Sequence, residues 1–529
     1  MTDPEGPPDR EPSFFAEETE DEPRPRASVR SIAIWGARTT GGLIGVAVAV
    51  VVVIASLFVT LPTWSVTPPV VEVSPEPASQ LFVCAGPLLR LADDSGQNAS
   101  EPTPIGGRPT TRFTSASGEI DVRALDQSDA GTGGTGRAPQ VAFVDPVDGE
   151  APIVSGMQTN RISALEGNIV GLVTASCQQP ALRSWILGGS TQLGRTSILT
   201  IDNPTNVEAI VDLDLYGELG PIDAVGLDGI VIPPGSQRVI PVNGFSLEQR
   251  APVIGITSTG GNVTAFMQES IIRTLTPGGV DLSGAQVPTD TLVIPGIRVA
   301  GETALTPIST SPADQDDTMP MLRLFAPGAK TIDATVAIIP LGATLADALA
   351  NEHRDDIDVP TDSHVLEETE PVAESFQVTL TEGAVAEVPM PGVAPGEYTV
   401  VVTADEPLVG GVRTSAIGTA GVDFAWFSPA DALGDEAVAA TPRVEAPRLF
   451  IANPTSAERN VTLTGPDGDV PIVIPAGGTA VAEVLPDADY TLSGMSGLRA
   501  VITGGADGLL TQSPLLPPAP LARPVKVFA

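Results

Sequence analysis

The stretch from Leu43 to Leu61 contains no charged side chain and is the strongest constraint on how the chain is organised. About 19 residues at roughly 1.5 Å rise per residue cross a bilayer core of about 30 Å. The charge-free window extends from Thr39 to Val71; Arg24, Arg26, Arg30 and Arg38 precede it, and the next basic residue is Arg90. This asymmetry predicts a single transmembrane helix over residues 39–61, with a cytoplasmic N-terminus and the bulk of the chain extracytoplasmic, at the plasma membrane.

The segments that flank this stretch are predicted to be irregular. Residues 1–38 are rich in proline and acidic side chains, which predicts a disordered cytoplasmic tail. Residues 62–78 are rich in proline and predict an extended linker. A cleaved signal peptide is the alternative, but about 40 residues precede the apolar run and no A-x-A-like exit follows it. Retention as a membrane anchor is therefore favoured.

Charge and composition narrow the possible partners. The 529 residues include 65 acidic and 27 basic side chains, for a net charge of −38. A surface for nucleic acid or anionic lipid needs clustered basic residues, so the composition argues against both as partners. The 54 glycines and 52 prolines, with only 4% aromatic residues, favour short strands joined by turns. The chain is therefore predicted to be mainly β.

The two cysteines, Cys84 and Cys177, both follow the predicted membrane segment. An even pair in an exported region predicts a disulfide, which closes a long loop and contributes roughly 4–5 kcal/mol in the chain-entropy model. A lipid-modified cysteine at position 84 is the alternative. It is disfavoured because Val83 precedes the cysteine where a small residue is needed, and because the apolar run ends too far upstream.

A short motif occurs twice in the same register. Ile201-Asp-Asn203-Pro204-Thr205 and Ile451-Ala-Asn453-Pro454-Thr455 are each followed by V-x-L and then by I-V-I-P-x-G. In such a motif the asparagine side chain starts a turn, the proline fixes φ, and V-x-L begins a strand with one buried face. The motif predicts that two parts of the chain share one fold.

Four further stretches are similar: residues 168–176, 262–270, 407–415 and 497–505 are interpreted as the same late strand of four units. Opening strands are predicted at Ser184, Thr291 and Ala425. The units are 79–180 with the disulfide and a flexible loop, 181–288, 289–421 with an acidic insertion, and 422–529 with a C-terminal tail. Their size fits about four tandem Ig-like antiparallel β-sandwiches. A β-propeller is disfavoured because its blades are nearer about 40–50 residues.

The segment after Cys177 carries a W-x-x-G-G…G-R…L-x-x-x-N-P-T pattern. Its residues are Trp185, Gly188, Gly189, Gly194, Arg195, Leu199, Asn203, Pro204 and Thr205. With the anchor and the paired cysteines, this pattern resembles an actinobacterial family of membrane-anchored, secreted proteins of unknown function, DUF5719. The similarity is densest over residues 168–270. It implies a cell-envelope location and, because members are often encoded beside a family-2 glycosyltransferase, a setting near surface glycans. It implies no catalytic residue.

No catalytic, cofactor or metal site is predicted. The histidines, His353 and His364, lie in the acidic insertion, residues 341–371, whose LADALANEH segment predicts a short helix. A solvated loop is favoured over a zinc site formed by these histidines and the neighbouring aspartates. Calcium at Asp314, Asp316 and Asp317 or in the insertion is a further alternative, although EF-hand spacing is missing. No G-x-S-x-G elbow occurs.

Two tryptophans and one arginine remain as candidates for recognition. Trp185 and Trp426 could stack on sugars, but a strand tryptophan more often lies in the core. Arg195 is predicted to pair with a carboxylate and hold an interface between units.

The leading hypothesis is a non-enzymatic envelope protein, a rod of β-sandwiches that serves as a scaffold or interaction module. The first alternative is a cell-wall polysaccharide-binding accessory to a glycosyltransferase. The second is a carboxylate-dependent hydrolase or transferase, which needs a cleft lined by paired acids. Envelope proteins and wall glycan are the expected partners besides the membrane.

Overall fold

The computed structural model describes residues 70–73, 79–91, 102–125, 127–128, 138–163, 169–273, 276–300, 319–328, 330–352, 370–390, 393–419, 421–518 and 525–528. Contacts divide the chain into two units, Met1–Val71 with Lys526–Ala529, and Glu72–Val525. A two-stranded sheet pairs β1 (Val70–Val73) with β35 (Val525–Phe528). All other described strands belong to the second unit.

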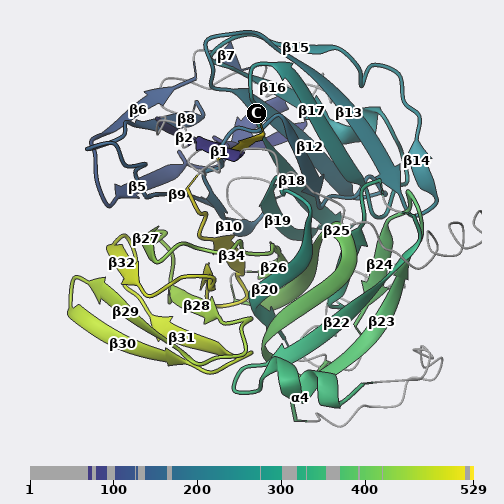
Figure 1. Ribbon diagram of the computed structural model, residues 1–529. Helices are drawn as coiled ribbons and strands as arrows, with labels where there is room; N and C mark the ends of the chain where they lie inside the picture. The colour runs from purple at the N-terminus through teal and green to yellow at the C-terminus, as the bar shows by residue number, and fades with distance from the viewer. Residues whose placement is uncertain are drawn as a thin grey trace, which may run out of the picture. The chain divides into compact units, whose positions relative to one another are not determined.

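The described residues are mainly β and form several sheets, as predicted (Figure 1). The predicted short helix is present as α4 (Leu345–Ala350), where Thr344 and Asp347 form a capping box. A 3-10 turn, η1, spans Val242–Gly244. No helix among the described residues is long and apolar enough to cross a bilayer. The predicted span, residues 39–61, and the predicted tail, residues 1–38, lie outside the described residues.

The first sheet pair joins the sheet β2-β8-β6 to the sheet β10-β9-β5. The strands of the first sheet are β2 (Gln80–Cys84), β6 (Ile120–Ala124) and β8 (Gln140–Val144). Those of the second are β5 (Thr110–Ser115), β9 (Val154–Ile162) and β10 (Gly171–Ser176). A separate hairpin pairs β3 (Leu88–Leu91) with β4 (Pro102–Ile105). The two sheets share a core that contains Phe82, Val154 and both cysteines.

The second sheet pair joins β11-β17-β13-β14, with β15 also on β13, to β19-β18-β12-β16-β7. The first of these sheets contains β11 (Arg183–Leu187), β13 (Ala209–Gly217), β14 (Gly220–Ile222), β15 (Ile230–Ile232) and β17 (Val253–Gly260). The other contains β7 (Gln127–Ser128), β12 (Arg195–Asn203), β16 (Ser236–Pro241), β18 (Thr264–Arg273) and β19 (Thr276–Gly284). In β13 the side chains alternate: Val211 and Leu213 enter the shared core, and Ile210 is exposed.

The third sheet pair is continuous through one long strand, β25 (Gly396–Gly418). The first part of β25 pairs with β20 and β22, and the second part pairs with β21 and β26. The other strands are β20 (Thr289–Val299), β21 (Met321–Phe325), β22 (Ile332–Pro340), β23 (Glu374–Leu380), β24 (Ala386–Pro389) and β26 (Gly421–Phe427). Leu292, Val336 and Val412 belong to one core shared by both layers.

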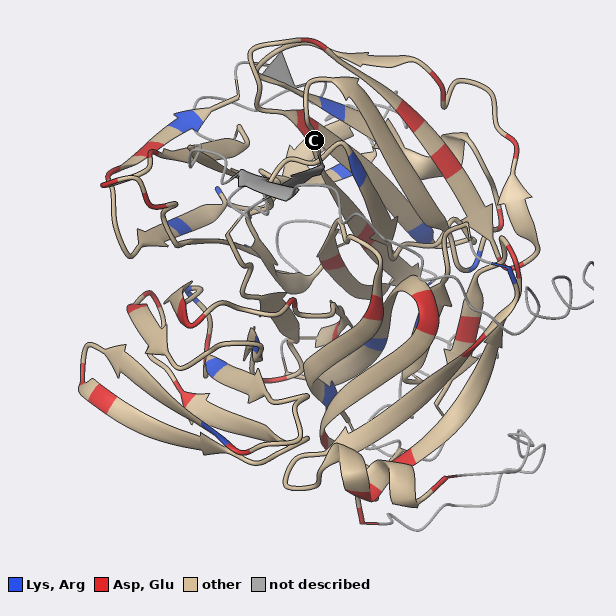
Figure 2. Cartoon of the chain, in the orientation of Figure 1, with Lys and Arg blue, Asp and Glu red and all other residues tan. Residues whose placement is uncertain are grey.

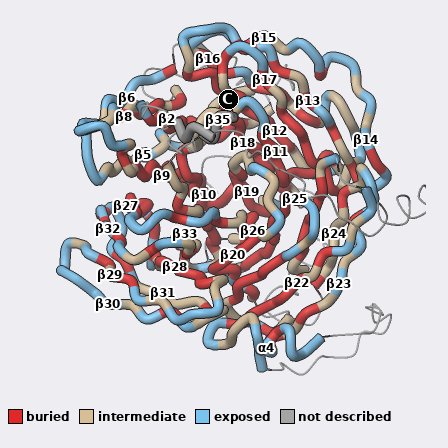
Figure 3. Tube along the Cα trace, in the orientation of Figure 1, coloured by how far each residue is buried: buried red, intermediate tan, exposed pale blue. Residues whose placement is uncertain are grey.

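The fourth sheet pair joins β27-β32-β29-β30 to β31-β28-β33-β34. The first sheet contains β27 (Glu436–Ala440), β29 (Arg459–Gly465), β30 (Gly468–Ile474) and β32 (Asp489–Ser493). The other contains β28 (Arg448–Ala452), β31 (Thr479–Glu483), β33 (Arg499–Gly504) and β34 (Thr511–Pro514). Val461 and Leu463 of β29 are buried in the core of this pair, and the outer strand β30 is largely exposed (Figure 3).

One pairing pattern recurs in all four sheet pairs. β9, β18, β25 and β33 each lie between an earlier strand (β5, β12, β21 or β28) and a following edge strand (β10, β19, β26 or β34). The sheet that ends in this edge strand is here called the inner sheet of its pair. The recurrence is a structural repeat over most of the second unit.

This pattern corrects two strand predictions. The stretch 168–176 contains β10, an edge strand, whereas the three stretches aligned with it lie in interior strands; the counterpart in the first sheet pair is β9. Ala425 lies in β26, which pairs with β25 and does not open the fourth sheet pair. Both errors have one cause. Edge strands that are buried at the centre of a protein carry the same small and apolar residues as interior strands.

The edge strands β10, β19, β26 and β34 meet at the centre of the second unit (Figure 1). β19 lies against β10 and β26, and β34 also lies against both β10 and β26. Successive units of a rod would contact only their chain neighbours. Because the first and fourth sheet pairs also contact each other, the predicted rod is wrong for this unit.

Candidate functional site

The two N-P-T turns have the same structure. The buried side chain of Asn203 donates to Val207 O (2.8 Å) and Ile232 O (3.0 Å), and its Oδ1 accepts from Thr205 N and Thr205 Oγ1. Asn453 repeats this with Ala457 O (2.8 Å) and Ile474 O (3.3 Å), and its Oδ1 accepts from Thr455 N and Thr455 Oγ1.

The two prolines, Pro204 and Pro454, occupy the position between the asparagine and the threonine of each turn. Each asparagine links the end of one strand to the I-V-I-P segment of the neighbouring sheet. The motif is therefore a structural element that joins the two layers of a sheet pair.

Gly188 and Gly189 bring backbone close to the third sheet pair. Their φ angles are +122° and +83°, a region that favours glycine. A Cβ on Gly189 would lie 2.7 Å from Ser197 Oγ. Gly189 N donates to Glu269 Oε2 (3.0 Å), and Gly189 O accepts from Arg323 Nη1 (2.9 Å). The two glycines thus allow a contact that larger residues would prevent.

Arg323, in β21, lies between the second and third sheet pairs with 1% of its surface exposed. Its Nη1 also donates to Pro252 O (3.3 Å), and its Nη2 donates to Arg250 O (3.2 Å) and to Glu387 Oε1 (2.7 Å). Its guanidinium carbon lies 4.6 Å from the centroid of the Trp426 ring. A buried arginine is tolerated when its donors find acceptors in this way.

Glu387, in β24, is the counter-ion of this arginine. Its Oε2 lies 2.9 Å from Arg250 Nε, and its side chain is 3% exposed. Burial raises the pKa of Glu387, but the positive charges of Arg323, Arg413 and Arg250 outweigh burial and hold the pKa below its usual value. The carboxylate is therefore ionised at neutral pH.

Two acidic side chains lie on the other side of Trp426. Its Nε1 donates to Glu269 Oε2 (2.8 Å), and its backbone N donates to Asp281 Oδ2 (2.6 Å). Glu269 and Asp281 stand opposite each other on β18 and β19. Burial raises the pKa of Asp281 to about 7, the backbone N–H groups of Trp426 and Leu282 oppose this, and Glu269 reinforces it.

Asp423, in β26 of the third sheet pair, accepts hydrogen bonds from residues of the other three sheet pairs. Its Oδ2 accepts from Leu172 N (3.0 Å) and Leu510 N (3.4 Å), and its Oδ1 accepts from Val280 N (3.4 Å). Burial raises its pKa well above the usual range for a carboxyl group. A single carboxyl thus supplies acceptors for edge-strand amides that have no neighbour within their own sheet.

Hydroxyl groups make the contact between β10 and β34. Thr511 Oγ1 accepts from Thr174 N (2.7 Å) and lies 2.6 Å from Thr174 Oγ1, which is 2.7 Å from Ser513 Oγ. Farther out, Arg112 of β5 binds Asp487 (3.0 Å) and Asp489 (2.8 Å), whose side chains are about half exposed. The direct side-chain contacts between the first and fourth sheet pairs therefore consist of buried hydroxyl groups and partly exposed ion pairs.

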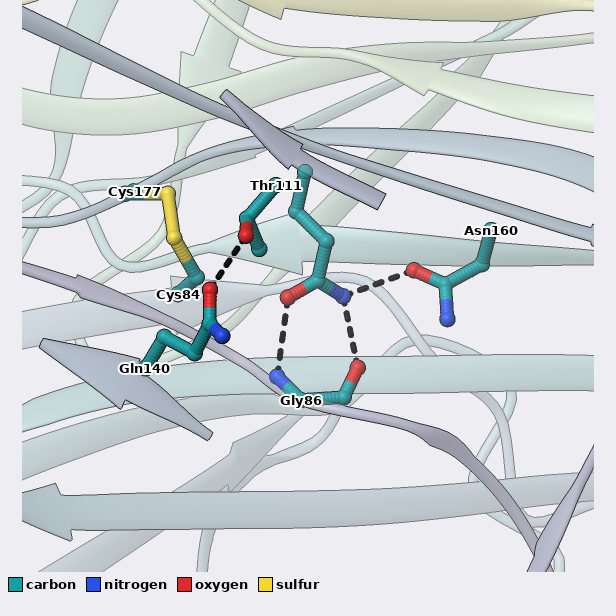
Figure 4. Close-up of a disulfide and its surroundings, with 7 residues drawn as sticks. Cys84, Gly86, Thr111, Gln140, Asn160 and Cys177 are labelled. Carbon is teal, nitrogen blue, oxygen red and sulfur yellow. Dashed lines mark hydrogen bonds between the residues drawn. A yellow bond between two sulfur atoms is a disulfide. The ribbon is translucent and has the colours of Figure 1, made fainter. Parts of the chain in front are cut away.

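The predicted disulfide between Cys84 and Cys177 is present, with Cα atoms 4.2 Å apart (Figure 4). Close to it, the buried Gln158 side chain accepts from Gly86 N (2.9 Å) and donates to Gly86 O (2.6 Å) and Asn160 Oδ1 (2.7 Å). The disulfide joins β2 to the segment that follows β10, so it connects the two layers of the first sheet pair.

The other residues singled out in the sequence, Trp426, Trp185 and Arg195, contact neighbouring side chains or backbone. Trp426 is buried, and the half-buried Trp185 packs on Tyr216 and Phe325 with ring centroids 5.8 Å and 5.3 Å away. Neither ring forms an exposed platform for a sugar. Arg195 Nη1 donates to Leu193 O (2.8 Å). Arg323 and Arg250 both bind across the junction between the second and third sheet pairs.

A hollow opens between the third and fourth sheet pairs, with an empty volume of about 290 Å³ that includes space open to solvent. Its charged lining consists of Arg298, Glu397 and Arg448. Arg298 stands opposite Glu397 on β20 and β25, and Arg448 of β28 forms an ion pair with Glu397. A second hollow, whose empty volume of about 240 Å³ also includes space open to solvent, is lined by apolar residues in the core of the second sheet pair.

The candidate metal ligands cannot be placed. His353, His364 and the aspartates at positions 314, 316 and 317 lie outside the described residues. Within the described residues, no three histidine, cysteine, aspartate or glutamate side chains are grouped to hold a metal ion. Acidic residues occur on strands and loops around the second unit, with basic residues more sparsely distributed (Figure 2).

The sequence reasoning did not find the buried residues Arg323, Glu387, Asp281 and Asp423. Their partners are distant in the chain: Arg323 and Glu387 are 64 positions apart, and Trp426 and Glu269 are 157 apart. The only local signal is a single charged residue inside an otherwise apolar strand, such as Asp423 in Gly-Val-Asp-Phe-Ala-Trp-Phe.

These features define a mainly β protein with several sheets, a disulfide and a buried network of charges. The chain belongs to DUF5719, a family of unknown function, whose model matches residues 131–351 and 367–476. The family predicted from the Trp185–Thr205 pattern is thereby confirmed. No curated protein matches the chain.

Proposed function

We propose that the protein is a single-pass membrane protein of the cell envelope whose extracytoplasmic body is a non-enzymatic scaffold or interaction module. The observation that carries this proposal is the disulfide between Cys84 and Cys177, both of which are 1% exposed. Structural disulfides persist in oxidising compartments and are rare in the cytosol. The charge-free stretch from Thr39 to Val71 supplies the means of anchoring.

The proposal includes the finer fold. We interpret each sheet pair as one Ig-like sandwich, because each has two layers around its own core, and their strands are antiparallel except for the short β7 beside β16. In this interpretation the sandwiches form one platform around their inner strands. A rigid platform suits a module that presents loops to envelope partners.

The surroundings of the acidic residues favour binding over catalysis. Glu269, Asp281 and Asp423 are closely grouped, but each is 4% exposed or less. Their oxygens accept hydrogen bonds from Trp426 and from backbone amides, so they hold strands together. A glycosidase pair has to face a cleft that admits substrate and water.

Site-specific labelling in intact cells tests the topology. Leu219→Cys places a thiol at a fully exposed hairpin tip, and Ser13→Cys places one in the predicted cytoplasmic tail. The native disulfide does not react with a maleimide. A membrane-impermeant maleimide is expected to label the first variant in intact cells and the second only after lysis. Labelling of Ser13→Cys alone in intact cells would overturn the proposed orientation.

A pull-down with the full chain in detergent tests the kind of partner. Capture of an envelope membrane protein, with no retention on isolated wall glycan, supports the scaffold role. Retention on purified glycan would replace it with the polysaccharide-binding alternative.

A further inference from the structure

We propose that the hollow between the third and fourth sheet pairs binds an anionic group, a carboxylate or a phosphate carried by a larger ligand. Arg298 and Arg448 are the binding residues, and Glu397 occupies the site in the absence of the ligand. This hollow is called the arginine cleft. The inference goes beyond the proposed function and does not depend on membrane topology.

The local charge of the arginine cleft is opposite to that of the chain. The chain has a net charge of −38, whereas the charged lining of the cleft is two guanidinium groups and one carboxylate. Glu483 stands opposite Arg448 on β31 but is not part of the lining. Two arginines from different sheet pairs that face one hollow form an unusual positive site on an acidic protein.

The backbone around the cleft allows close approach. The β20–β25 register is interrupted between Ile294 and Ile297, and Gly296 in the bulge has a φ of +76°. A Cβ on Gly296 would lie 2.7 Å from Thr503 Cγ2. Bulges of this kind redirect neighbouring side chains and are enriched near binding sites. Here the bulge immediately precedes Arg298.

The arginines retain donors for a ligand. Arg298 is exposed, and its hydrogen bond from Nη1 to Gly505 O is long, at 3.4 Å. A guanidinium has five N–H donors in a planar fork that matches a carboxylate or a phosphate. The side chain of Arg448 is 29% exposed, so both arginines are accessible from solvent.

The arginines also destabilise each other in the absence of an anion. Burial lowers the pKa of Arg448, and the charge of Arg298 lowers it further, whereas Glu483 opposes the shift. A second anion placed between the guanidinium groups would relieve this repulsion. The ion pair between Arg448 and Glu397 already does so in part, with a carboxylate from the protein itself.

The size of the cleft limits what enters it. The empty volume of about 290 Å³ includes open solvent, so the hollow encloses no large molecule, and only a charged group at its mouth reaches the arginines. The rest of the ligand therefore lies outside, along the seam between the two sheet pairs. An acidic sugar and a phosphate ester both have this form.

Calorimetric titration of the full chain in detergent tests the inference, with inorganic phosphate and glucuronate as separate probes. Arg298→Gln and Arg448→Gln are each expected to weaken binding of the active probe about tenfold or more, because each removes a charge-assisted hydrogen bond. Glu397→Gln removes the internal competitor and is expected to tighten binding several-fold. Arg183→Gln, an exposed arginine on β11, is the matched control and is expected to bind as the wild type does.

Binding of phosphate alone or of glucuronate alone supports the inference and identifies the ligand class. Binding of neither probe by the wild-type chain overturns it. So does an unchanged or weaker affinity of Glu397→Gln, because a purely structural ion pair would not restrain anion binding. Thermal unfolding of each variant shows whether it is folded, and Glu397→Gln and Arg298→Gln keep the test decisive if Arg448→Gln unfolds. None of these outcomes alters the labelling pattern that tests the proposed function.

Discussion

Arg323 and Glu387 are paired on neighbouring strands of the third sheet pair, with 1% and 3% of their side chains exposed, and Arg323 donates to backbone oxygens of the second. Arg112 meets Asp487 and Asp489 between the first and fourth sheet pairs, where the side-chain exposures are 29%, 52% and 50%. The inner part of the first junction contains the buried carboxyl groups of Glu269 and Asp281 against Trp426, whereas β10 and β34 contact each other through hydroxyl groups at the second. One protein thus uses two different chemistries to join equivalent pieces of structure.

The two junctions differ in how much free energy is lost when one partner of an interaction is removed. A buried charged group has no water molecules to replace a lost partner. Removal of one partner is therefore far more destabilising than removal of a neutral hydrogen bond. Surface ion pairs are exchanged for water at little cost. The junction between the second and third sheet pairs is therefore expected to be permanent, and the junction between the first and fourth is expected to open first.

Arg323→Met should have the largest effect. It removes the hydrogen bonds to Gly189 O, Pro252 O and Arg250 O and leaves Glu387 buried with less positive charge. The expected loss is about 3–5 kcal/mol of the free energy of unfolding, measured by urea denaturation. The double variant with Glu387→Met should regain much of the loss. A loss below about 1 kcal/mol for Arg323→Met would contradict a special role for buried charge.

Asp281→Asn should change how stability depends on pH. The pKa of Asp281 is about 7 in the folded protein against a usual 3.8, so between those values the folded form holds a proton that the unfolded form has lost. Stability due to this group is therefore present at low pH and falls as pH rises from about 4 to 7, by about 1.4 kcal/mol per pH unit. The variant should show a shallower slope across this window. An unchanged slope would show that Asp281 titrates normally.

Thr174→Val should have a moderate effect at the other junction. It removes the hydroxyl that contacts Thr511 and Ser513 and leaves both in a buried site. The expected loss is about 1–2 kcal/mol, with no change in the pH slope. Thr174→Ser keeps the hydroxyl and serves as the control. A loss as large as that of Arg323→Met would remove the distinction between the junctions.

Arg112→Ala should have the smallest effect. Its ion pairs with Asp487 and Asp489 are partly solvated, so the expected loss is below about 1 kcal/mol. Most of the loss should disappear in 1 M salt, where exposed charges are screened. A large, salt-independent loss would mean that the first and fourth sheet pairs depend on this contact.

Local features of the fold were predictable from the sequence because they repeat or are encoded within a few residues. Asn203 and Asn453 each hydrogen-bond within their own turns and to one neighbouring strand, which preserves the N-P-T pattern in both copies. The cysteine pair could be predicted because only two cysteines exist. The capping residues Thr344 and Asp347 likewise lie three positions apart at the start of α4.

The arrangement of the sheet pairs could not be predicted in the same way. It depends on contacts such as Asp423 with Leu172 and Leu510, whose sequence separations are 251 and 87. The sequence does not distinguish a buried aspartate from a solvated one, because the burial of the side chain depends on the position of distant strands. The arginine cleft has the same origin, because Arg298 and Arg448 are brought together by the packing of two sheet pairs.

The central position of β10, β19, β26 and β34 has a consequence for aggregation during synthesis. Each strand pairs within its sheet on one side only, and an uncovered strand edge is a template for pairing with another chain. In the finished unit the four edges protect one another. The last of them, β34, is made after the other three, so β10 and β26 lack the part of their cover that β34 provides until Thr511–Pro514 has been synthesised.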